Sequence, residues 1–276
     1  HLCPVLCALS PDMQFTLTSD EGLPIHGNLD APPNPRALAV VVHGFKGYKD
    51  WGFFPWLAEA LCNHHLAVCR FNMSRSGVGE NFDAFDRLDL FRDDTYSVQL
   101  ADLHAVVRFA RGNVDAPLFL LGHSRGGGVA LLAAPEIEDL CGVATWNAIS
   151  TADRWDAAAK AEWRRSGQLS IVNARTKQLM PMSTRILDDY EANRDRLDIL
   201  AAAARLEAPI LVVHGGKDES VPSEESERIA ARAKDASRVR IETATHTFNA
   251  IHPLVHVPGE LSLAAEVTAH FIGVYA

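Results

Sequence analysis

The chain has 276 residues, and 26 Lys and Arg against 35 Asp and Glu give it a net charge of −9 at pH 7. Nucleic acids and anionic membranes are bound by clustered Lys and Arg, so this balance argues against both as partners. With 47% hydrophobic and 22% charged residues, the composition is that of a globular protein and excludes disordered and fibrous classes.

Apolar runs of strand length alternate with segments of helical period, which predicts an α/β fold with a mostly parallel sheet and helices on both faces. The run at 37–42 is apolar at every position and is therefore expected in the centre of the sheet. The expected strands are 13–18, 23–29, 37–42, 66–71, 118–121, 141–146, 210–213 and 238–243. The expected helices are 56–64, 98–110, 129–134, 224–233 and 261–272.

One long segment interrupts this alternation. Residues 150–205 lie between two expected strands and are rich in Trp, Arg and Met, whereas a crossover between parallel strands needs only about a dozen residues. We therefore predict a core made of residues 1–149 and 206–276, with a small cap of residues 150–205 over one end of the sheet.

The cysteines indicate reduced, mostly buried thiols. They are odd in number and widely spread, and none forms a CxxC pair, which argues against a disulfide framework or a zinc site. No apolar run reaches the ~18 residues of a membrane span. We expect a cytoplasmic protein without a bound metal. The five cysteines are Cys3, Cys7, Cys62, Cys69 and Cys141.

The strongest motif is Gly122-His123-Ser124-Arg125-Gly126, which follows an apolar strand and precedes a helix. A G-x-S-x-G sequence in this context places its serine on a strained strand-to-helix turn, where small neighbours let the backbone pass closely. Backbone N–H groups at the start of the helix point to the same place. Ser124 is therefore the predicted nucleophile, and the alternative is a glycine-rich packing turn.

A serine nucleophile needs a histidine base and an orienting carboxylate. Asp218 follows the strand 210–213 and is preferred over the adjacent Glu219, while His246 lies on a short polar loop after the last strand. The chain order Ser, Asp, His is then satisfied. Asp218 alternatively caps a turn, and His246 alternatively bonds only to backbone. The other histidines considered as bases were His64, His65, His214, His252, His256 and His270.

The oxyanion of a tetrahedral intermediate requires N–H donors. The backbone N–H of Arg125, directly after the nucleophile, is one candidate. The other is the N–H of Phe45, in the turn His43-Gly44-Phe45 after the central strand. The alternative interpretation of that turn is purely structural.

These residues together resemble the α/β-hydrolase family, and the resemblance spans nearly the whole chain. The motifs around His43, Phe71 to Gly77 and Asn173 to Thr176 are similar to hydrolases described as dienelactone-hydrolase-like or prolyl-oligopeptidase-like. The resemblance implies the α/β-hydrolase fold, with an eight-stranded, mostly parallel sheet, an antiparallel second strand and a small cap inserted after strand 6. It also implies a serine acyl-hydrolase without cofactors.

Two departures narrow the implied substrate. Dienelactone hydrolases carry a cysteine where this chain has Ser124, which favours ordinary carboxylic esters over lactones. Prolyl-oligopeptidase enzymes carry a propeller domain for which this chain has no room, so a peptidase would lack its usual means of selecting peptides.

The substrate pocket is expected between the strand ends and the cap. Aromatic and Met clusters more often form core than ligand contacts, but their concentration here favours an apolar or aromatic ester. Lys46, Arg75 and Arg175 either meet a substrate carboxylate or phenolate or are solvated and paired. The expected lining residues are Phe45, Trp51, Phe53, Phe54, Trp155, Trp163, Met180, Met182 and Phe248.

The sequence thus predicts a carboxylesterase that takes a small-molecule ester, short-chain or aromatic (feruloyl-like), through an acyl-enzyme. The alternatives are an aminopeptidase or acyl-peptide hydrolase, a thioesterase, and a ligand-binding module without activity. The sequence is compatible with a homodimer and does not decide between oligomeric states.

Overall fold

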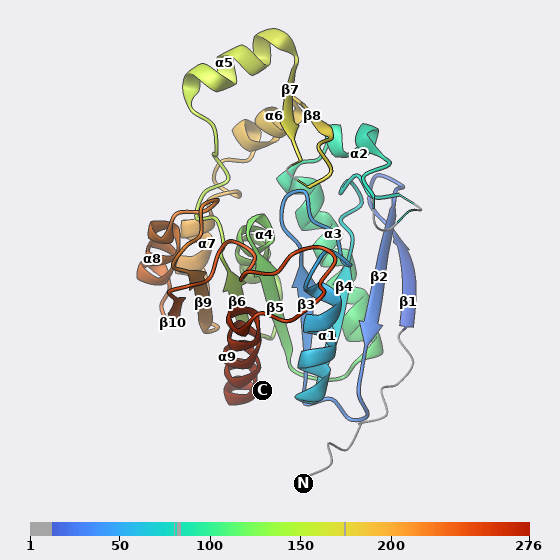
Figure 1. Cartoon of the computed structure of the whole chain (residues 1–276), viewed down its shortest axis with the longest axis vertical. Helices are drawn as coiled ribbons and strands as arrows, with labels where there is room; N and C mark the ends of the chain where they lie inside the picture. The colour runs from blue at the N-terminus through green and yellow to red at the C-terminus, as the bar shows by residue number, and fades with distance from the viewer. Residues whose placement is uncertain (1–12, 80, 82–83, 174) are drawn as a thin grey trace.

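The main sheet has eight strands in the order β1-β2-β4-β3-β5-β6-β9-β10 (Figure 1), in a computed structural model that describes residues 13–79, 81, 84–173 and 175–276. Strand β2 is antiparallel to both β1 and β4, and the other pairs are parallel. This confirms the predicted sheet and its antiparallel second strand. The strands are β1 (Met13–Thr18), β2 (Pro24–Asp30), β3 (Ala37–Val42), β4 (Leu66–Phe71), β5 (Leu118–His123), β6 (Leu140–Trp146), β9 (Ile210–Gly215) and β10 (Ala236–Ile241).

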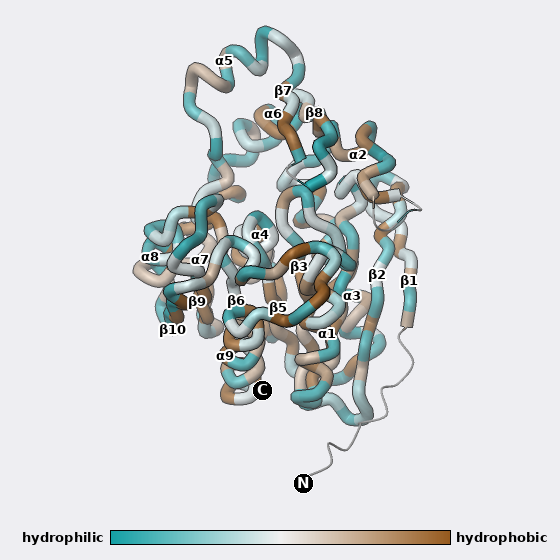
Figure 2. Tube along the Cα trace, in the orientation of Figure 1, coloured by the Kyte–Doolittle hydropathy of each residue, from teal (hydrophilic) through white to brown (hydrophobic). Residues whose placement is uncertain are grey.

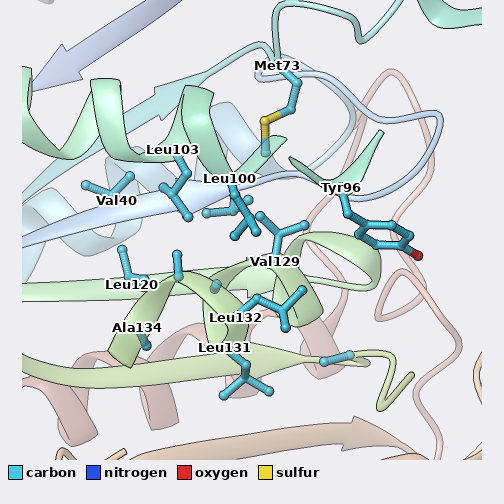
Figure 3. Packing of buried hydrophobic residues seen from close by; sticks show 14 of the residues in the cluster. Val40, Met73, Tyr96, Leu100, Leu103, Leu120, Val129, Leu131, Leu132 and Ala134 are labelled. Atoms are coloured by element: carbon cyan, nitrogen blue, oxygen red, sulfur yellow. The ribbon is translucent and has the colours of Figure 1, made fainter. Parts of the chain in front are cut away.

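The central strands are covered on both faces by helices. Every residue of β3, β4, β5 and β9 is buried, as their continuous apolar runs predict. On one face, α3 and α4 pack with the sheet, and Leu100, Leu103, Val129 and Leu132 meet Val40 and Leu120 there (Figure 3). Helices α1 and α9 cover the other face. The flanking helices are α1 (Phe54–Asn63), α3 (Tyr96–Asn113), α4 (Arg125–Ala133), α8 (Ser223–Arg232) and α9 (Gly259–Tyr275), with a short 3₁₀ turn at Ala134–Glu136; the short helix α2 (Leu88–Arg92) instead contacts β8 (Leu179–Ser183).

Two strands extend further than expected, and this places the functional residues. Strand β5 continues to His123 because Gly122 and His123 still pair with β6, and β9 continues to Gly215 because it still pairs with β10. Helix α4 begins at Arg125, well before the expected 129. Ser124 is therefore the single residue between β5 and α4.

The segment between β6 and β9 contains elements that the sequence did not predict. Helix α5 (Ala157–Ser166), the antiparallel hairpin of β7 (Gln168–Val172) and β8 (Leu179–Ser183), and α6 (Arg185–Ala192) lie together beyond one end of the main sheet (Figure 1). Figure 2 shows that hydrophilic residues are frequent in outer segments such as α5.

Helix α7 (Ile199–Arg205) ends this segment and contacts α4 and α8, which flank the main sheet. It is thus the crossover helix that returns the chain to β9, as parallel strands require. The predicted cap of residues 150–205 consequently includes a helix that packs on the core.

Candidate active site

Ser124 occupies a strained turn between β5 and α4. Its φ of 56° and ψ of −122° lie in a region that non-glycine residues rarely adopt. The residues two positions before and two positions after it must be glycines. A Cβ on Gly126 would lie 2.2 Å from the carbonyl oxygen of Val42, and a Cβ on Gly122 would lie 2.3 Å from the carbonyl oxygen of Gly126. The N–H of Ser124 donates to the carbonyl oxygen of Trp146 at 2.8 Å, which ties the turn to β6.

Three predicted side chains form one continuous hydrogen-bonded chain. The Nε2 of His246 lies 3.1 Å from the Oγ of Ser124, and its Nδ1 lies 2.8 Å from the Oδ2 of Asp218. These residues come from the turn after β5, the turn after β9 and the loop after β10. All three turns follow carboxyl ends of parallel strands, so residues far apart in sequence meet at one edge of the sheet. The arrangement permits His246 to take the Ser124 proton while Asp218 holds the ring.

The surroundings of Asp218 favour its charged form. Burial by itself opposes the charge, but the hydrogen bond and charge of His246 and the N–H groups of Ser220 and Val221 outweigh it, so the pKa of Asp218 is lowered. Those N–H groups donate to Oδ1 at 2.8 Å and 3.0 Å, which leaves Oδ2 for His246. The side chain of Asp218 is only 1% exposed. By contrast, the alternative acid Glu219 is exposed.

A buried histidine, His214, lies beneath this carboxylate. Its Nε2 is 3.0 Å from the carbonyl oxygen of Val221 and 3.7 Å from the Oδ2 of Asp218. Burial lowers the pKa of His214, which favours its neutral form. His214 therefore supports the Asp218 turn instead of serving as the base.

Asn147, which the sequence did not single out, connects the acid and base loops. Its Nδ2 donates to the carbonyl oxygens of His246 at 2.8 Å and Thr245 at 3.3 Å, and its Oδ1 accepts the N–H of Gly215 at 2.7 Å. Asn147 is fully buried and has a φ of 49°, which asparagine tolerates better than most residues. The signal that the sequence offered is an asparagine directly after the apolar strand 141–146.

His123 holds the base loop from the other side. Its Nε2 lies 2.8 Å from the carbonyl oxygen of His246, so this nitrogen carries a proton and donates it. Burial, followed by the charge of His246, lowers the pKa of His123 to about 3. A neutral His123 and Asn147 thus fix the backbone of His246 together.

The two expected oxyanion donors flank the nucleophile. Arg125 is the first residue of α4, where an N–H has no partner within the helix. Phe45 follows Gly44, which approaches so closely that a Cβ there would lie 2.9 Å from the Cβ of Ser124. The assignment of both N–H groups to an oxyanion hole stays a prediction.

The Arg125 side chain has a packing role that the sequence did not indicate. Its guanidinium is 3.9 Å from the ring centroid of Phe45 and 5.1 Å from that of Tyr96. Its Nη1 lies 3.7 Å from the Oδ2 of Asp94, and the side chain is only 6% exposed. Arg125 therefore packs the Phe45 turn against the start of α4.

A pocket of about 250 Å³ opens beside Ser124 and His246. Trp51 and Phe54 line it, as expected, together with Phe45. Lys46, Asn173 and Arg175 line it as well, and the sequence analysis had not placed Asn173 there. The pocket therefore has an aromatic wall from the loop before α1 and a polar wall from the β7–β8 hairpin.

Six expected lining residues lie outside this pocket: Phe53 and Met182, which are buried, and Phe248, Trp155, Trp163 and Met180. Phe248 is fully buried and meets the Trp146 ring edge-on, with ring centroids 5.0 Å apart; its backbone φ is 53°. Trp163 is buried against Trp155 at 5.0 Å, and its Nε1 donates to the carbonyl oxygen of Met182. Met180 is also fully buried. Trp155, Trp163 and Met180 thus pack in or against the hydrophobic core and do not line this pocket.

The remaining sequence expectations concern thiols, metals and membranes. Burial raises the pKa of the Cys62 thiol to about 12, and Cys69 is also buried and free, whereas Cys3 and Cys7 lie outside the described residues. Within residues 13–276, apart from the gaps stated above, no group of three or more His, Cys, Asp or Glu is placed to hold a metal. No helix in that part of the chain has the length and apolar character needed to cross a membrane.

Comparison with known proteins is consistent with this architecture. Residues 39–257 match the model of the alpha/beta hydrolase family. An uncharacterized protein, YfhR of Salmonella typhi, is 28% identical over 229 residues, which cover 80% of this chain and 69% of the relative.

Two solved structures share the fold. Est1E of Butyrivibrio proteoclasticus with bound ferulic acid has a TM-score of 0.68 at 23% identity, covering 95% of this chain and 98% of the other. The esterase domain of a Rhodothermus marinus protein has a TM-score of 0.69 at 20% identity, covering 96% and 99%.

Proposed function

Since the chain belongs to the alpha/beta hydrolase family, we propose that it is a serine carboxylesterase acting on short-chain or aromatic esters. The observation that carries this proposal is the hydrogen-bonded chain from Ser124 Oγ through His246 to Asp218. Such a chain makes a serine hydroxyl nucleophilic at neutral pH, because the histidine takes its proton and the carboxylate orients the histidine.

In the first step, His246 Nε2 takes the proton of Ser124 while Oγ attacks the ester carbonyl carbon. The resulting oxyanion is held by the N–H groups of Phe45 and Arg125. His246 then gives the proton to the alkoxide as the carbon–oxygen bond breaks, and the alcohol leaves. Asp218 keeps Nδ1 protonated and stabilises the imidazolium.

In the second step, water replaces the alcohol. His246 takes a proton from the water as its oxygen attacks the acyl-enzyme carbonyl, and a second tetrahedral oxyanion forms in the same place. Collapse returns the proton to Ser124 Oγ and releases the carboxylic acid. One water is consumed, and no oxidant, reductant or cofactor is needed.

The pocket walls support a small or flat acyl or alcohol group. Phe45, Trp51 and Phe54 offer aromatic faces beside the nucleophile, and the volume of about 250 Å³ suits a compact ester. Est1E, which shares the fold, was solved with ferulic acid, an aromatic acid. These features favour feruloyl-like and short-chain esters over long acyl chains.

The test is hydrolysis of 4-nitrophenyl acetate by wild type and Ser124→Ala. We expect the variant to lose at least about a thousandfold in kcat/KM, since the nucleophile is removed, with an unchanged circular dichroism spectrum. A fluorophosphonate probe should modify Ser124 in the wild-type protein, as located by peptide mass spectrometry. Activity close to wild type in Ser124→Ala, or modification of a different serine, would refute the assignment.

A further inference from the structure

The pocket beside Ser124 has charge of one sign only. Among its lining residues in the described part of the chain, Lys46 and Arg175 are cationic and none is a carboxylate. This contrasts with the chain as a whole, whose net charge is −9. The positive charge of the pocket therefore results from the positions of Lys46 and Arg175 and not from the overall composition.

Lys46 is partly buried without an anionic partner. No carboxylate of the described residues lies within ion-pair distance of its ammonium group, which is 5.8 Å from the centroid of the Phe45 ring. Burial, together with the charge of Arg125, lowers the pKa of Lys46. An anion in the pocket would oppose both causes, because a nearby negative charge favours the charged form of the Lys46 ammonium group.

Arg175 reaches the same pocket from the loop between β7 and β8. The Oδ1 of Asn173 accepts the N–H groups of Arg175 at 3.0 Å and Thr176 at 3.2 Å, which shapes this loop. The Nη2 of Arg175 lies 3.4 Å from the hydroxyl of Tyr48, a buried residue of the core. The guanidinium is exposed, and within the described residues it has no carboxylate partner.

Arg75, the third cation considered for substrate contact, differs from Lys46 and Arg175 because it forms an ion pair within the protein. Its Nε lies 2.5 Å from Glu21, and it does not line the pocket. Of the three cations that the sequence offered for substrate contact, Arg75 is thus paired within the protein, whereas Lys46 and Arg175 line the pocket of Ser124 and have no carboxylate partner among the described residues.

We propose that Lys46 and Arg175 form a subsite for a carboxylate, so that the preferred substrates are esters carrying a second, ionised carboxyl group, such as half-esters of dicarboxylic acids. This inference rests on the proposed esterase function. A substrate with a free ammonium group, as an aminopeptidase requires, is disfavoured by the same two charges.

The test uses three 4-nitrophenyl esters of equal chain length and different charge. Their acyl groups are hemisuccinate, which is anionic, butyrate, which is neutral, and 4-aminobutyrate, which is cationic. We expect kcat/KM to be about tenfold or more higher for the hemisuccinate than for the butyrate, as one charged hydrogen bond supplies, and lowest for the 4-aminobutyrate. The preference should shrink as salt concentration rises.

Two variants and a matched control locate the effect. Lys46→Gln and Arg175→Gln should each reduce the hemisuccinate-to-butyrate ratio by about fivefold to tenfold. Lys177→Gln removes the same charge from the same hairpin loop but does not touch the pocket, and it should leave the ratio unchanged.

Binding to the Ser124→Ala protein separates this inference from the catalytic proposal. Calorimetric titration with the same hemisuccinate and butyrate esters should show tighter binding of the anion, and Arg175→Gln should abolish the difference. Hydrolysis without any anion preference, or a preference that both Gln variants retain, overturns the subsite but leaves the esterase. If the Ser124→Ala protein binds the anionic ester more tightly but the wild-type protein hydrolyses none of the esters, the subsite is supported and the esterase proposal is refuted.

Discussion

Replacing Asp218 with Asn should change the proton position on His246 without changing the shape of the site. The N–H groups of Ser220 and Val221 would hold the Asn oxygen as they hold Oδ1 of Asp218. The amide NH₂ would then lie where Oδ2 lies, 2.8 Å from His246 Nδ1. An NH₂ can only donate, so Nδ1 must accept and the proton must move to Nε2. That nitrogen faces Ser124, and it can no longer serve as a base.

The magnitude follows from the charge that is lost. A carboxylate and an imidazolium about 4 Å apart at an effective dielectric constant of about 20 attract by roughly 4 kcal/mol. At about 1.4 kcal/mol per factor of ten, this corresponds to a loss of about a thousandfold in kcat. KM should change little, since Asp218 does not line the pocket.

The assay is steady-state hydrolysis of 4-nitrophenyl acetate, with thermal unfolding measured alongside. Glu219→Gln is the matched control, because it removes a carboxylate from the adjacent, exposed position and should retain full activity. An Asp218→Asn protein that folds normally and keeps more than a tenth of the wild-type kcat would refute this account of the site.

Three further predictions concern the supports of the site. Asn147→Asp tolerates the φ of 49° but turns a carboxylate towards two carbonyl oxygens, so kcat should fall about tenfold at nearly constant KM; a change confined to KM would contradict this. Gly126→Ala should lower the free energy of unfolding by more than about 2 kcal/mol in urea, whereas Gly112→Ala, with open space around it, should raise it by up to about 1 kcal/mol. Similar effects of the two alanines would contradict the close packing. Burial lowers the pKa of His43 to about 4, so its stabilising contribution should be full above pH 6.5 and be lost as pH falls towards 4. The difference in the free energy of unfolding between wild type and His43→Gln should therefore narrow by up to about 1.4 kcal/mol per pH unit over that range. A difference that stays constant with pH would contradict this prediction.

Much of the fold and the central residues of the site were predictable because their signals are local. Each main-sheet strand was expected within about two residues of its observed bounds: the buried parallel strands are continuous apolar runs, and the outer strand β10 shows an alternating pattern. Ser124, Asp218 and His246 each directly follow such a strand or its turn, and the sheet then brings them together.

The pocket walls were less predictable, because apolar character does not tell which way a side chain points. Phe248 follows His246 closely but turns into the core against Trp146. Trp163 and Met180 are buried in the hydrophobic core, although they come from the inserted segment, whose hairpin had no clear strand pattern in the sequence. Asn147 was missed because its role depends on two loops that meet only in the folded chain.

The inserted segment leaves the core after β6 and returns to β9, and these strands are direct neighbours. Their register, from Val143 opposite Ile210 to Trp146 opposite Val213, is set by backbone pairing and does not depend on what lies between them. Residues can therefore be gained or lost around the hairpin over evolutionary time without altering the spacing of the serine, histidine and aspartate. Relatives built on this plan are expected to diverge first in the molecules that they accept and last in the reaction that they perform.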